Sequence, residues 1–201
     1  MKKTMRKMNK RQLQAMDTHQ RIHKTALSLM EKYGYDNVTI RDICEAAGVA
    51  TGTFYTYFKA KSDIFSSMYV EADQYFATHV AANLSQGSAT DQIIEFFIEY
   101  AKYNEDSGLD RMKLLYNPEN KWFITKGRQM PEVLKNILLS GQKKGELVDT
   151  ISAEQMTEWL FIAARGIVYD WCLHDASYDQ QAFMKEYFGV FLNALVKKDS
   201  L

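Results

Sequence analysis

The chain has 201 residues, and 46% of them are apolar, which is enough to bury a sizeable core. No apolar run approaches the ~18 residues of a membrane span, and Cys44 and Cys172 have neither metal-site nor disulfide spacing, so a membrane-spanning protein and a disulfide scaffold are excluded. The net charge is zero, but residues 1–61 hold 12 Lys and Arg against 5 Asp and Glu, whereas residues 62–201 hold 13 against 20. This split predicts a head that binds nucleic acid and a body that does not.

Basic residues crowd the start of the chain. Residues 1–11 contain no acid, and we predict a basic arm over residues 1–17. This arm is either a solvated tail or a segment that follows DNA phosphates or enters the minor groove. A first helix is predicted over residues 18–33, with Gly34 as its stop. Its apolar residues recur at helical spacing and are Ile22, Ala26, Leu29 and Met30.

The next segment predicts two short helices joined by a tight turn. Thr39 can accept a hydrogen bond from a free amide of the first helical turn, and Gly48 tolerates the left-handed conformation of a helix stop. Thr51 is the predicted cap of the second helix. The apolar side of that helix is formed by Phe54 and Phe58. Its other side offers hydroxyls, phenols and cations without a carboxylate, from Thr51, Thr53, Tyr55, Tyr57, Lys59 and Lys61. The pattern predicts a helix-turn-helix whose exposed side suits a polyanion.

The run GYDNVTIRDICEAAGVATGTFYTYFKAKSDIF resembles the signature of the TetR/AcrR family of bacterial transcriptional repressors. The resemblance covers roughly residues 18–65. It implies an all-α fold in which a three-helix helix-turn-helix DNA-binding head is joined by a long helix to a helical ligand-binding and dimerisation body. We therefore expect the basic arm over residues 1–17, the head over 18–61, and the effector-binding and dimerisation domain over 62–201.

The resemblance also implies which residues bind DNA. They are Thr39, Arg41, Thr51, Gly52, Thr53, Tyr55, Tyr57 and Lys61. The start of the second short helix reads base edges, the two phenols and Lys61 hold phosphates, and Arg41 reaches a guanine edge or a phosphate. Two alternatives stay open: the phenols belong to an aromatic core, or Arg41 forms a salt bridge with Asp42 or Glu45.

Beyond the head, the pattern predicts helices and no sheet. A connecting helix is expected over residues 62–84. At its entrance Ala60 departs from the family pattern, because alanine cannot cap, and we expect a stability loss of about 1 kcal/mol or less there. Further helices are predicted at 90–106, 109–116, 118–126, 131–145, 152–175 and 179–198. No run alternates apolar and polar residues for long enough to indicate a strand.

The body is rich in aromatic residues, with 20 of the 26 aromatics lying after residue 61. Repressors that the chain resembles carry an aromatic-lined effector cavity in this region. The expected effector-binding residues are Phe96, Tyr100, Tyr103, Tyr116, Trp122, Trp159 and Tyr169. Glu99, Asp110 and Asp170 are candidate partners for a cationic ligand. The alternative is that the rings fill a helical core and the carboxylates are solvated.

The last two predicted helices have the composition of a subunit interface. Between Glu158 and Asp170 only Arg165 is charged, and a helix this apolar needs partners on several sides. Pairing both helices with their symmetry mates gives a four-helix contact and a two-fold homodimer. The expected interface residues are Ala163, Gly166, Ile167, Phe188 and Phe191. The two heads then meet successive major grooves of a palindromic operator, about 34–36 Å apart.

The sequence therefore predicts a cytoplasmic, nucleoid-associated repressor that binds double-stranded DNA as a homodimer and is released by a small apolar or aromatic effector. No cofactor, metal or membrane contact is expected. The alternative is a dimeric DNA-binding protein without a ligand, which acts as an architectural or partner-recruiting factor. An enzyme is disfavoured, because His19 and His23 have metal-ligand spacing but no third ligand and are expected on the helix surface.

Overall fold

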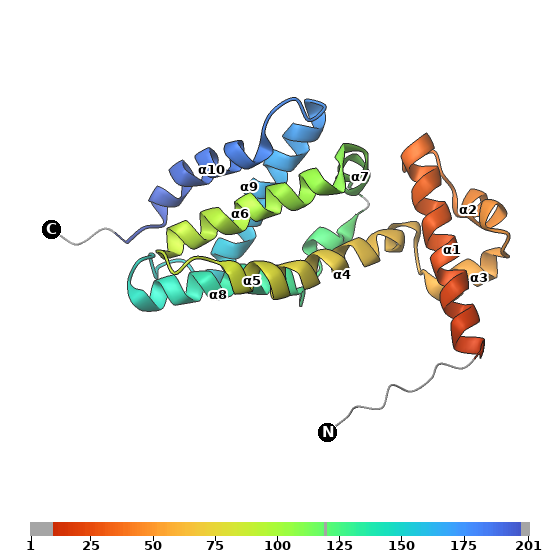
Figure 1. Ribbon diagram of the computed structural model, residues 1–201, viewed down its shortest axis with the longest axis horizontal. Coiled ribbons are helices and arrows are strands. Elements are labelled where there is room, and N and C mark those ends of the chain that lie inside the picture. The colour runs from red at the N-terminus through yellow and green to blue at the C-terminus, as the bar shows by residue number, and fades with distance from the viewer. Residues whose placement is uncertain (1–9, 119, 198–201) are drawn as a thin grey trace, which may run out of the picture. The chain divides into compact units, whose positions relative to one another are not determined.

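A computed structural model of the chain describes residues 10–118 and 120–197 (Figure 1). These residues form helices and loops, and the only extended pairing among them is one antiparallel bridge between Leu147 and Val196. The predicted all-α fold is confirmed. The chain divides into two compact units at Ser66 and Ser67, the first of which we call the head and the second the body.

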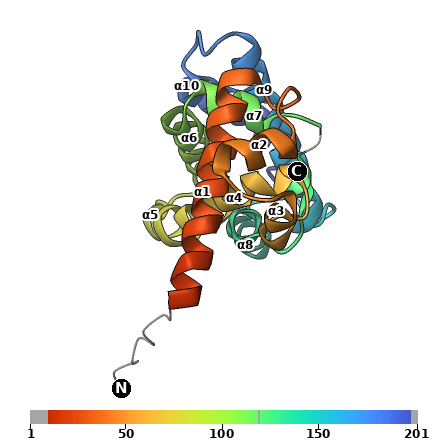
Figure 2. The ribbon, with the colours of Figure 1, turned by 90° about the vertical axis from the view of Figure 1, so that its right-hand side faces the viewer.

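The head contains three α-helices and a short 3₁₀ helix. They are α1 (Lys10–Tyr33), α2 (Ile40–Ala47), α3 (Thr51–Tyr57) and η1 (Lys61–Phe65). Both views place α1 alongside α2 and α3 (Figures 1 and 2). The helix α1 begins at Lys10 rather than at Thr18, because residues 10–17 contain good helix formers and neither Gly nor Pro. The predicted arm is therefore helical from Lys10, and residues 1–9 lie outside the described part of the chain.

Local signals define α2. The Thr39 hydroxyl accepts a hydrogen bond from the Asp42 amide, and the Asp42 carboxylate accepts one from the Thr39 amide, which is a complete capping box. At the other end Gly48 has a φ of 63°, and the amides of Gly48 and Val49 donate to the carbonyls of Glu45 and Cys44. This is a Schellman motif, and it turns the chain sharply toward α3.

The start of α3 differs from the prediction. Ala50 occupies the N-cap position without a side-chain hydrogen bond, and Thr51 is the first helical residue. The predicted Thr51 cap is wrong because the Schellman turn already fixes where the helix starts. Phe54 and Phe58 are buried as predicted and pack with ring centroids 5.3 Å apart. The head core is completed by Ile22, Ala26, Met30, Val38, Ile43, Ile64 and Phe65.

The loss of a cap at Ala60 is offset by a neighbouring carboxylate. The Oδ2 of Asp63 accepts hydrogen bonds from the amides of Lys59, at 2.7 Å, and Ala60, at 3.2 Å. Asp63 therefore satisfies two amides at the start of η1, those of Lys59 and Ala60. Its negative charge also interacts favourably with the helix dipole.

The body contains the remaining helices. They are α4 (Ser66–Tyr75), a π-helical segment η2 (Phe76–Val80), α5 (Ala81–Asn83), α6 (Ala89–Ser107), α7 (Leu109–Leu115), η3 (Lys121–Ile124), α8 (Gln129–Lys144), α9 (Ala153–Leu173), α10 (Gln180–Phe191) and η4 (Leu192–Ala194). The predicted connecting helix over 62–84 is thus present, but a 3₁₀ turn begins it and a π-bulge interrupts it.

Two predicted helices are shorter in the structure. The segment 118–126 forms only the four-residue η3, and α10 with η4 ends at Ala194 rather than near residue 198. The final described residues leave the helix because they pair with another segment. The amide of Val148 donates to the Leu195 carbonyl at 2.9 Å, and the amide of Lys197 donates to the Glu146 carbonyl at 3.0 Å.

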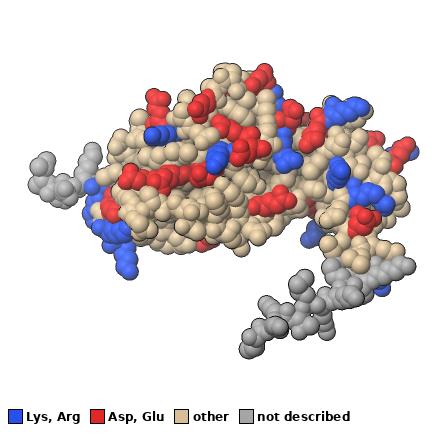
Figure 3. All heavy atoms as spheres, in the orientation of Figure 1, with Lys and Arg blue, Asp and Glu red and all other residues tan. Residues whose placement is uncertain are grey.

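Aromatic rings pack the centre of the body. The rings of Phe97 on α6 and Phe188 on α10 stack with centroids 4.1 Å apart. Phe161 on α9 packs edge-on against Phe97 at 5.9 Å and against Tyr100 at 6.0 Å. Because these contacts join α6, α9 and α10, they hold these three body helices in register. Acidic side chains are prominent on the face of the body that Figure 3 shows.

Candidate functional site

The exposed side of α3 carries the residues expected to meet DNA. Thr51 and Gly52 are exposed, and Tyr55 has 54% of its surface open to solvent. Thr53 and Tyr57 are half-buried, and the Tyr57 ring packs edge-on against His19. The core alternative is therefore wrong for Tyr55, whose ring projects from the head.

Arg41 and Thr39 lie at the start of α2. Arg41 is exposed, and within the described residues it makes no ion pair with Asp42 or Glu45, so the salt-bridge alternative is not what the structure has. The Thr39 hydroxyl donates to the Asp42 carboxylate at 2.7 Å. The Thr39 hydroxyl therefore donates one hydrogen bond to Asp42 and accepts another from it. Because the hydroxyl proton is used in the cap, the Thr39 methyl is the part of the side chain that can contact DNA.

Lys61 has a structural role that the sequence did not reveal. Its ammonium donates to the carbonyls of Tyr35, at 2.6 Å, and Val38, at 2.8 Å, and it lies 4.0 Å from the centroid of the Tyr35 ring. The expected phosphate contact needs correction, since these bonds direct the ammonium into the head, where it fixes the loop between α1 and α2.

The two histidines of α1 also face inward. The His19 ring stacks on Phe58 with centroids 4.7 Å apart, and Nε2 of His23 donates to the Ile64 carbonyl at 2.8 Å. The expectation that both lie on the helix surface is wrong. They bind α1 to the segment that follows α3, and thereby help to orient α3.

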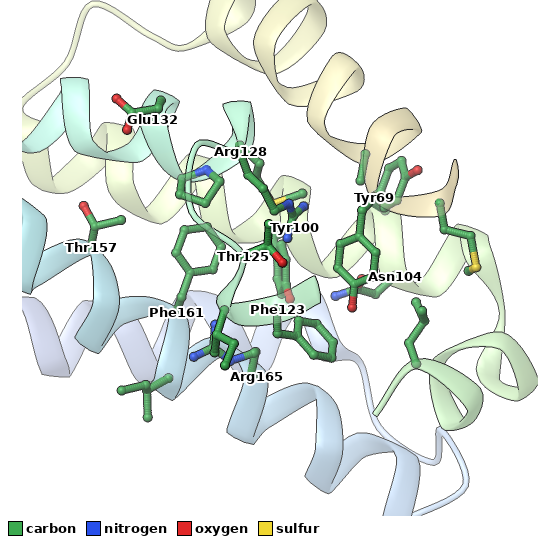
Figure 4. Close-up of a pocket in the computed structure, with 18 of the residues that line it drawn as sticks. Tyr69, Tyr100, Asn104, Phe123, Thr125, Arg128, Glu132, Thr157, Phe161 and Arg165 are labelled. Atoms are coloured by element: carbon green, nitrogen blue, oxygen red, sulfur yellow. The ribbon is translucent and has the colours of Figure 1, made fainter. Parts of the chain in front are cut away.

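The body contains a partly open cavity of about 500 Å³ (Figure 4). Its walls come from α4, α6, α7, the η3 loop, α8 and α9, and this volume lies in the range of small-molecule sites. Apolar side chains form much of the lining, including Met68, Ala72, Met112, Leu115, Phe123, Met130, Phe161 and Ile162. A helical body with this much internal space can admit a ligand without unfolding.

Only part of the expected effector set reaches this cavity. Tyr100, Tyr103 and Tyr116 line it. The other four members lie elsewhere: Phe96, Trp122, Trp159 and Tyr169. Phe96 is fully buried against Phe76 and Phe97, and Trp122 stacks on Tyr69 beside the cavity. Trp159 and Tyr169 are exposed, because their positions on α9 point away from the ring cluster.

The expected carboxylates are also placed elsewhere. Glu99 accepts a hydrogen bond from the Tyr75 hydroxyl at 3.0 Å, and Asp170 accepts one from the Tyr178 hydroxyl at 3.1 Å. Asp110 is exposed on α7. None of the three lines the cavity, so the prediction that they hold a cationic ligand there is wrong.

One end of the cavity is rich in hydrogen-bond donors. The hydroxyls of Tyr100 and Tyr116 lie 3.0 Å apart, and the Asn120 amide donates to the Tyr69 hydroxyl at 2.8 Å. Burial raises the pKa of all three tyrosines, which therefore stay protonated at neutral pH. The buried Asn104 amide acts on the Tyr100 hydroxyl and lowers its pKa, but its nitrogen has no partner of good hydrogen-bond geometry.

Three arginines that sequence reasoning missed line the same cavity: Arg111, Arg128 and Arg165. Arg128 forms a bidentate pair with Asp73, at 2.9 and 3.1 Å, and lies 4.4 Å from the centroid of the Tyr69 ring. Arg165 lies 5.8 Å from the centroid of the Phe123 ring. Arg165 was noted only as the single charge of an apolar helix. This isolation could have indicated a binding role, because a charged residue is rarely buried unless a partner compensates its charge.

The exposed side of α9 and α10 carries an apolar stripe. Its members are Ile162, Tyr169, Leu173, Phe183, Tyr187 and Val190, with the exposed Gly166 between the first two. The expected interface residues are only partly on this stripe. Ile167 and Phe188 are buried in the protomer's own core and need correction, whereas Ala163 and Phe191 are half-buried.

A family model described as "Bacterial regulatory proteins, tetR family" matches residues 22–68. The helix-turn-helix head of the chain is therefore of the tetR type. The chain is 25% identical over 180 residues to the "Probable acrEF/envCD operon repressor" of Escherichia coli strain K12, which covers 83% of this chain and 81% of that protein. It is 22% identical to the "Fatty acid metabolism regulator protein" of Bacillus subtilis strain 168, over 90% of this chain and 96% of the relative.

The family's fold extends through the body. The crystal structure of the transcriptional regulator FadR from Bacillus subtilis in complex with stearoyl-CoA superposes with a TM-score of 0.63 at 20% identity, covering 86% of this chain and 96% of that one. The chain thus shares the fold of this regulator, with a helix-turn-helix head of the tetR type and a helical body. None of its described helices is both long and apolar enough to cross a membrane.

Proposed function

We propose that the chain is a ligand-responsive repressor that binds a palindromic operator as a homodimer and is released by a small apolar or aromatic effector. The observation that carries this proposal is the body cavity, because one of its walls is α4, the helix that follows directly on the head. A ligand in contact with Met68, Tyr69 and Ala72 acts on that helix. The ligand-free architectural alternative gives no reason for such a cavity.

Operator recognition falls to the exposed side of α3. Thr51, Gly52 and Thr53 meet base edges, and Tyr55 and Tyr57 hold phosphates. Arg41 projects from α2 as an additional donor. Lys61 supports this surface from within the head, since it fixes the loop that precedes α2.

A homodimer follows from the apolar stripe of α9 and α10. Exposed apolar residues that recur on one face of each helix are typical of an interaction site, and a two-fold contact covers the same stripe on both protomers. Gly166 has open space around its α-carbon, which permits the close approach of a partner helix. Ala163 and Phe191 lie at the margin of the contact, while Ile167 and Phe188 support it from the core.

Release follows from differential affinity. An effector that binds better to the conformation with low operator affinity shifts the population toward it, and coupling of about 1–3 kcal/mol between the two sites is ordinary. The stearoyl-CoA complex of the Bacillus subtilis relative supports the idea that this fold accommodates a ligand.

The test is selection of randomised duplex DNA by the purified protein, followed by affinity measurements at two salt concentrations. The expected result is a palindrome whose affinity falls steeply with salt. Thr53→Ala is expected to relax sequence preference at one position, whereas Tyr55→Phe weakens binding evenly on all sequences. Recovery of unrelated sequences, at every effector tried, would contradict the proposal.

A further inference from the structure

The donor-rich end of the cavity offers hydrogen-bond donors to an acceptor group of a ligand. Tyr100 and Tyr116 share one hydrogen bond through two hydroxyls, so one of their two protons remains for a ligand. The Asn104 side chain is only 6% exposed, and its amide nitrogen lies close enough to the Tyr100 hydroxyl to lower the pKa of that group but has no partner of good hydrogen-bond geometry. A buried donor without a partner costs free energy unless a ligand or water satisfies it. The unpaired amide therefore points to an acceptor group at this end.

Arg165 adds a positive charge that no carboxylate neutralises. Within the described residues no Asp or Glu oxygen lies within 4.0 Å of its guanidinium, whereas Arg128 is held by Asp73. Its guanidinium lies 5.8 Å from the centroid of the Phe123 ring, and that ring packs against the Tyr116 ring with centroids 4.8 Å apart. The charge also lowers the pKa of Tyr100 and Tyr116 against the larger effect of burial. A half-buried cation facing hydroxyl donors favours an anion.

Three of the four acidic residues of the lining, Glu132, Glu154 and Glu158, lie toward the opposite end, whereas Glu71 acts on Tyr103. Glu132 pairs with Lys135 at 2.7 Å, and Glu154 acts on the same lysine. Glu158 precedes Arg165 by seven residues on α9, which is about 10 Å along a helix. Figure 4 shows Glu132 and Thr157 on one side of the cavity, with Phe123 and Arg165 closer to its middle. The cavity is therefore polarised along α9.

Between the two ends the lining is apolar. The rings of Phe123 and Phe161 and the side chains of Met112 and Leu115 offer contact to an alkyl chain or an aromatic ring. A ligand that satisfies both features has an apolar body and one anionic end.

We propose, on the basis of the proposed function, that the effector is an amphipathic carboxylate whose anionic group binds Arg165 and the Tyr100–Tyr116 pair. The Asn104 amide donates to the same group, and the apolar body lies between Phe123 and Phe161. Planar bidentate recognition of a carboxylate is what a guanidinium provides and an ammonium does not.

The experiment compares three probes of the same chain length, titrated into the full-length protein by isothermal calorimetry. They are decanoate, neutral decanamide and cationic decylamine. Decanoate is expected to bind at least about 10-fold more tightly than decanamide, because hydrogen bonds to a charged group are the stronger ones. Decylamine is expected to bind most weakly. Decanoyl-CoA is titrated separately. It has the same acyl chain as decanoate but carries an uncharged thioester in place of the carboxylate.

Arg165→Met is the decisive variant, with Arg111→Met as its matched control. Arg111 lines the same cavity, but its charge acts on Tyr103 and not on Tyr100 or Tyr116. Arg165→Met is expected to weaken decanoate binding by about 10- to 100-fold and decanamide binding by less than about 3-fold. Arg165→Lys is expected to recover part of the loss. Arg111→Met is expected to change either affinity by less than about 3-fold, and thermal melting confirms that each variant is folded.

Several outcomes would overturn the inference. These are equal binding of decanoate and decanamide, an equal effect of the two arginine variants, binding of decanoyl-CoA without decanoate, and binding of no probe. None of them touches the operator selection, so the proposed repressor function is judged separately. Release of the selected operator by a neutral aromatic compound, with decanoate inactive, would keep the repressor function and reject the carboxylate.

Discussion

The head and the body are built from the same kind of helix but are specified differently. In the head, α2 begins at a capping box and ends at a Schellman turn, so hydrogen bonds within a few residues determine it. In the body, α6, α9 and α10 are aligned by rings that lie far apart in the sequence, such as Phe97 and Phe188. The head is therefore specified mostly by local signals and the body mostly by tertiary packing.

This difference accounts for where each function resides. A DNA-reading surface requires one short helix at a fixed angle, and local hydrogen bonds define such an element. A ligand cavity requires walls from several helices that do not fill the space between them. Its residues are assembled by packing, so the cavity is sensitive to changes at positions that do not touch it.

The largest effect is expected from truncation of the body core. Phe97→Ala removes a fully buried ring that stacks on Phe188 and packs against Phe161, and we expect a loss of about 3–5 kcal/mol in the free energy of unfolding. All three tryptophans, Trp122, Trp159 and Trp171, belong to the body, so urea unfolding followed by their fluorescence reports this unit.

Val70→Ala is the matched control for Phe97→Ala. Val70 lies on α4 with 60% of its surface exposed, and its truncation is expected to change stability by less than about 0.5 kcal/mol. Similar losses for the two variants would mean that the ring cluster does not determine the stability of the body.

The next effect concerns the ion pair that closes one wall of the cavity. Arg128→Met leaves the Asp73 carboxylate without its bidentate partner, and both side chains are largely buried. We expect a loss of roughly 3 kcal/mol, the lower end of the range for breaking a buried pair, because cavity water can reach the carboxylate. Urea unfolding measures it.

The double variant Asp73→Asn, Arg128→Met tests the cause. Asparagine removes the charge and keeps the oxygen that accepts a hydrogen bond from the Met130 amide at 3.1 Å. It is expected to recover at least half of the loss, since the penalty comes from an uncompensated buried charge. A double variant as unstable as the single one would show that packing of the arginine, rather than charge, is what matters.

Much of the head was predictable because its signals are local. The Thr39 cap, the Gly48 stop and the buried pair Phe54 and Phe58 follow from residue type and spacing. Lys61 was not, because the carbonyls that it binds belong to Tyr35 and Val38, more than 20 residues away. A lysine at a helix entrance has the same sequence appearance whether it points into the head or toward DNA.

The body was predictable in its helices but only partly in its cavity. Helical spacing gives the face of a residue on its own helix, but not the neighbour that this face meets. Tyr100 and Phe96 are both buried on α6, yet only Tyr100 lines the cavity. Arg165 illustrates the same limit, since its proposed role in ligand binding depends on the hydroxyls of Tyr100 and Tyr116, which come from two other segments of the chain.

A smaller effect is expected at the turn of the head. Gly48→Ala places a side chain at a φ of 63°, which costs about 1–2 kcal/mol for an L-residue even though the surrounding space is open. Differential scanning calorimetry is expected to show a lower melting temperature for the head, together with weaker binding of the selected operator.

Gly52→Ala separates folding from DNA contact in the same unit. Gly52 lies inside α3 with open space around it, so alanine is expected to stabilise the helix by about 0.5–1 kcal/mol. If Gly52 allows the backbone to approach DNA, operator affinity falls although stability rises. A rise in both would remove Gly52 from the DNA interface.

The smallest effect tests whether the same local device matters equally in both units. Capping boxes occur at Thr39 with Asp42 in the head and at Ser88 with Asp91 in the body. Hydrogen bonds from the cap hydroxyl and amide hold the pKa of each carboxyl below its ordinary value of 3.8. A lowered folded pKa gives stabilisation that is complete above the unfolded value and is lost as the pH falls through the folded one.

Asp42→Asn and Asp91→Asn are therefore expected to destabilise the protein near about pH 7 and to approach the parent as the pH falls through the lowered folded pKa, because the carboxyl is then protonated in both states. Circular dichroism melts at several pH values measure this. The Asp42 change is expected to matter more, because α2 has 8 residues and depends on its ends, whereas α6 has 19 and is held by its ring contacts. Equal effects would mean that local hydrogen bonds govern both units alike, and the contrast between the head and the body would then rest on the aromatic core alone.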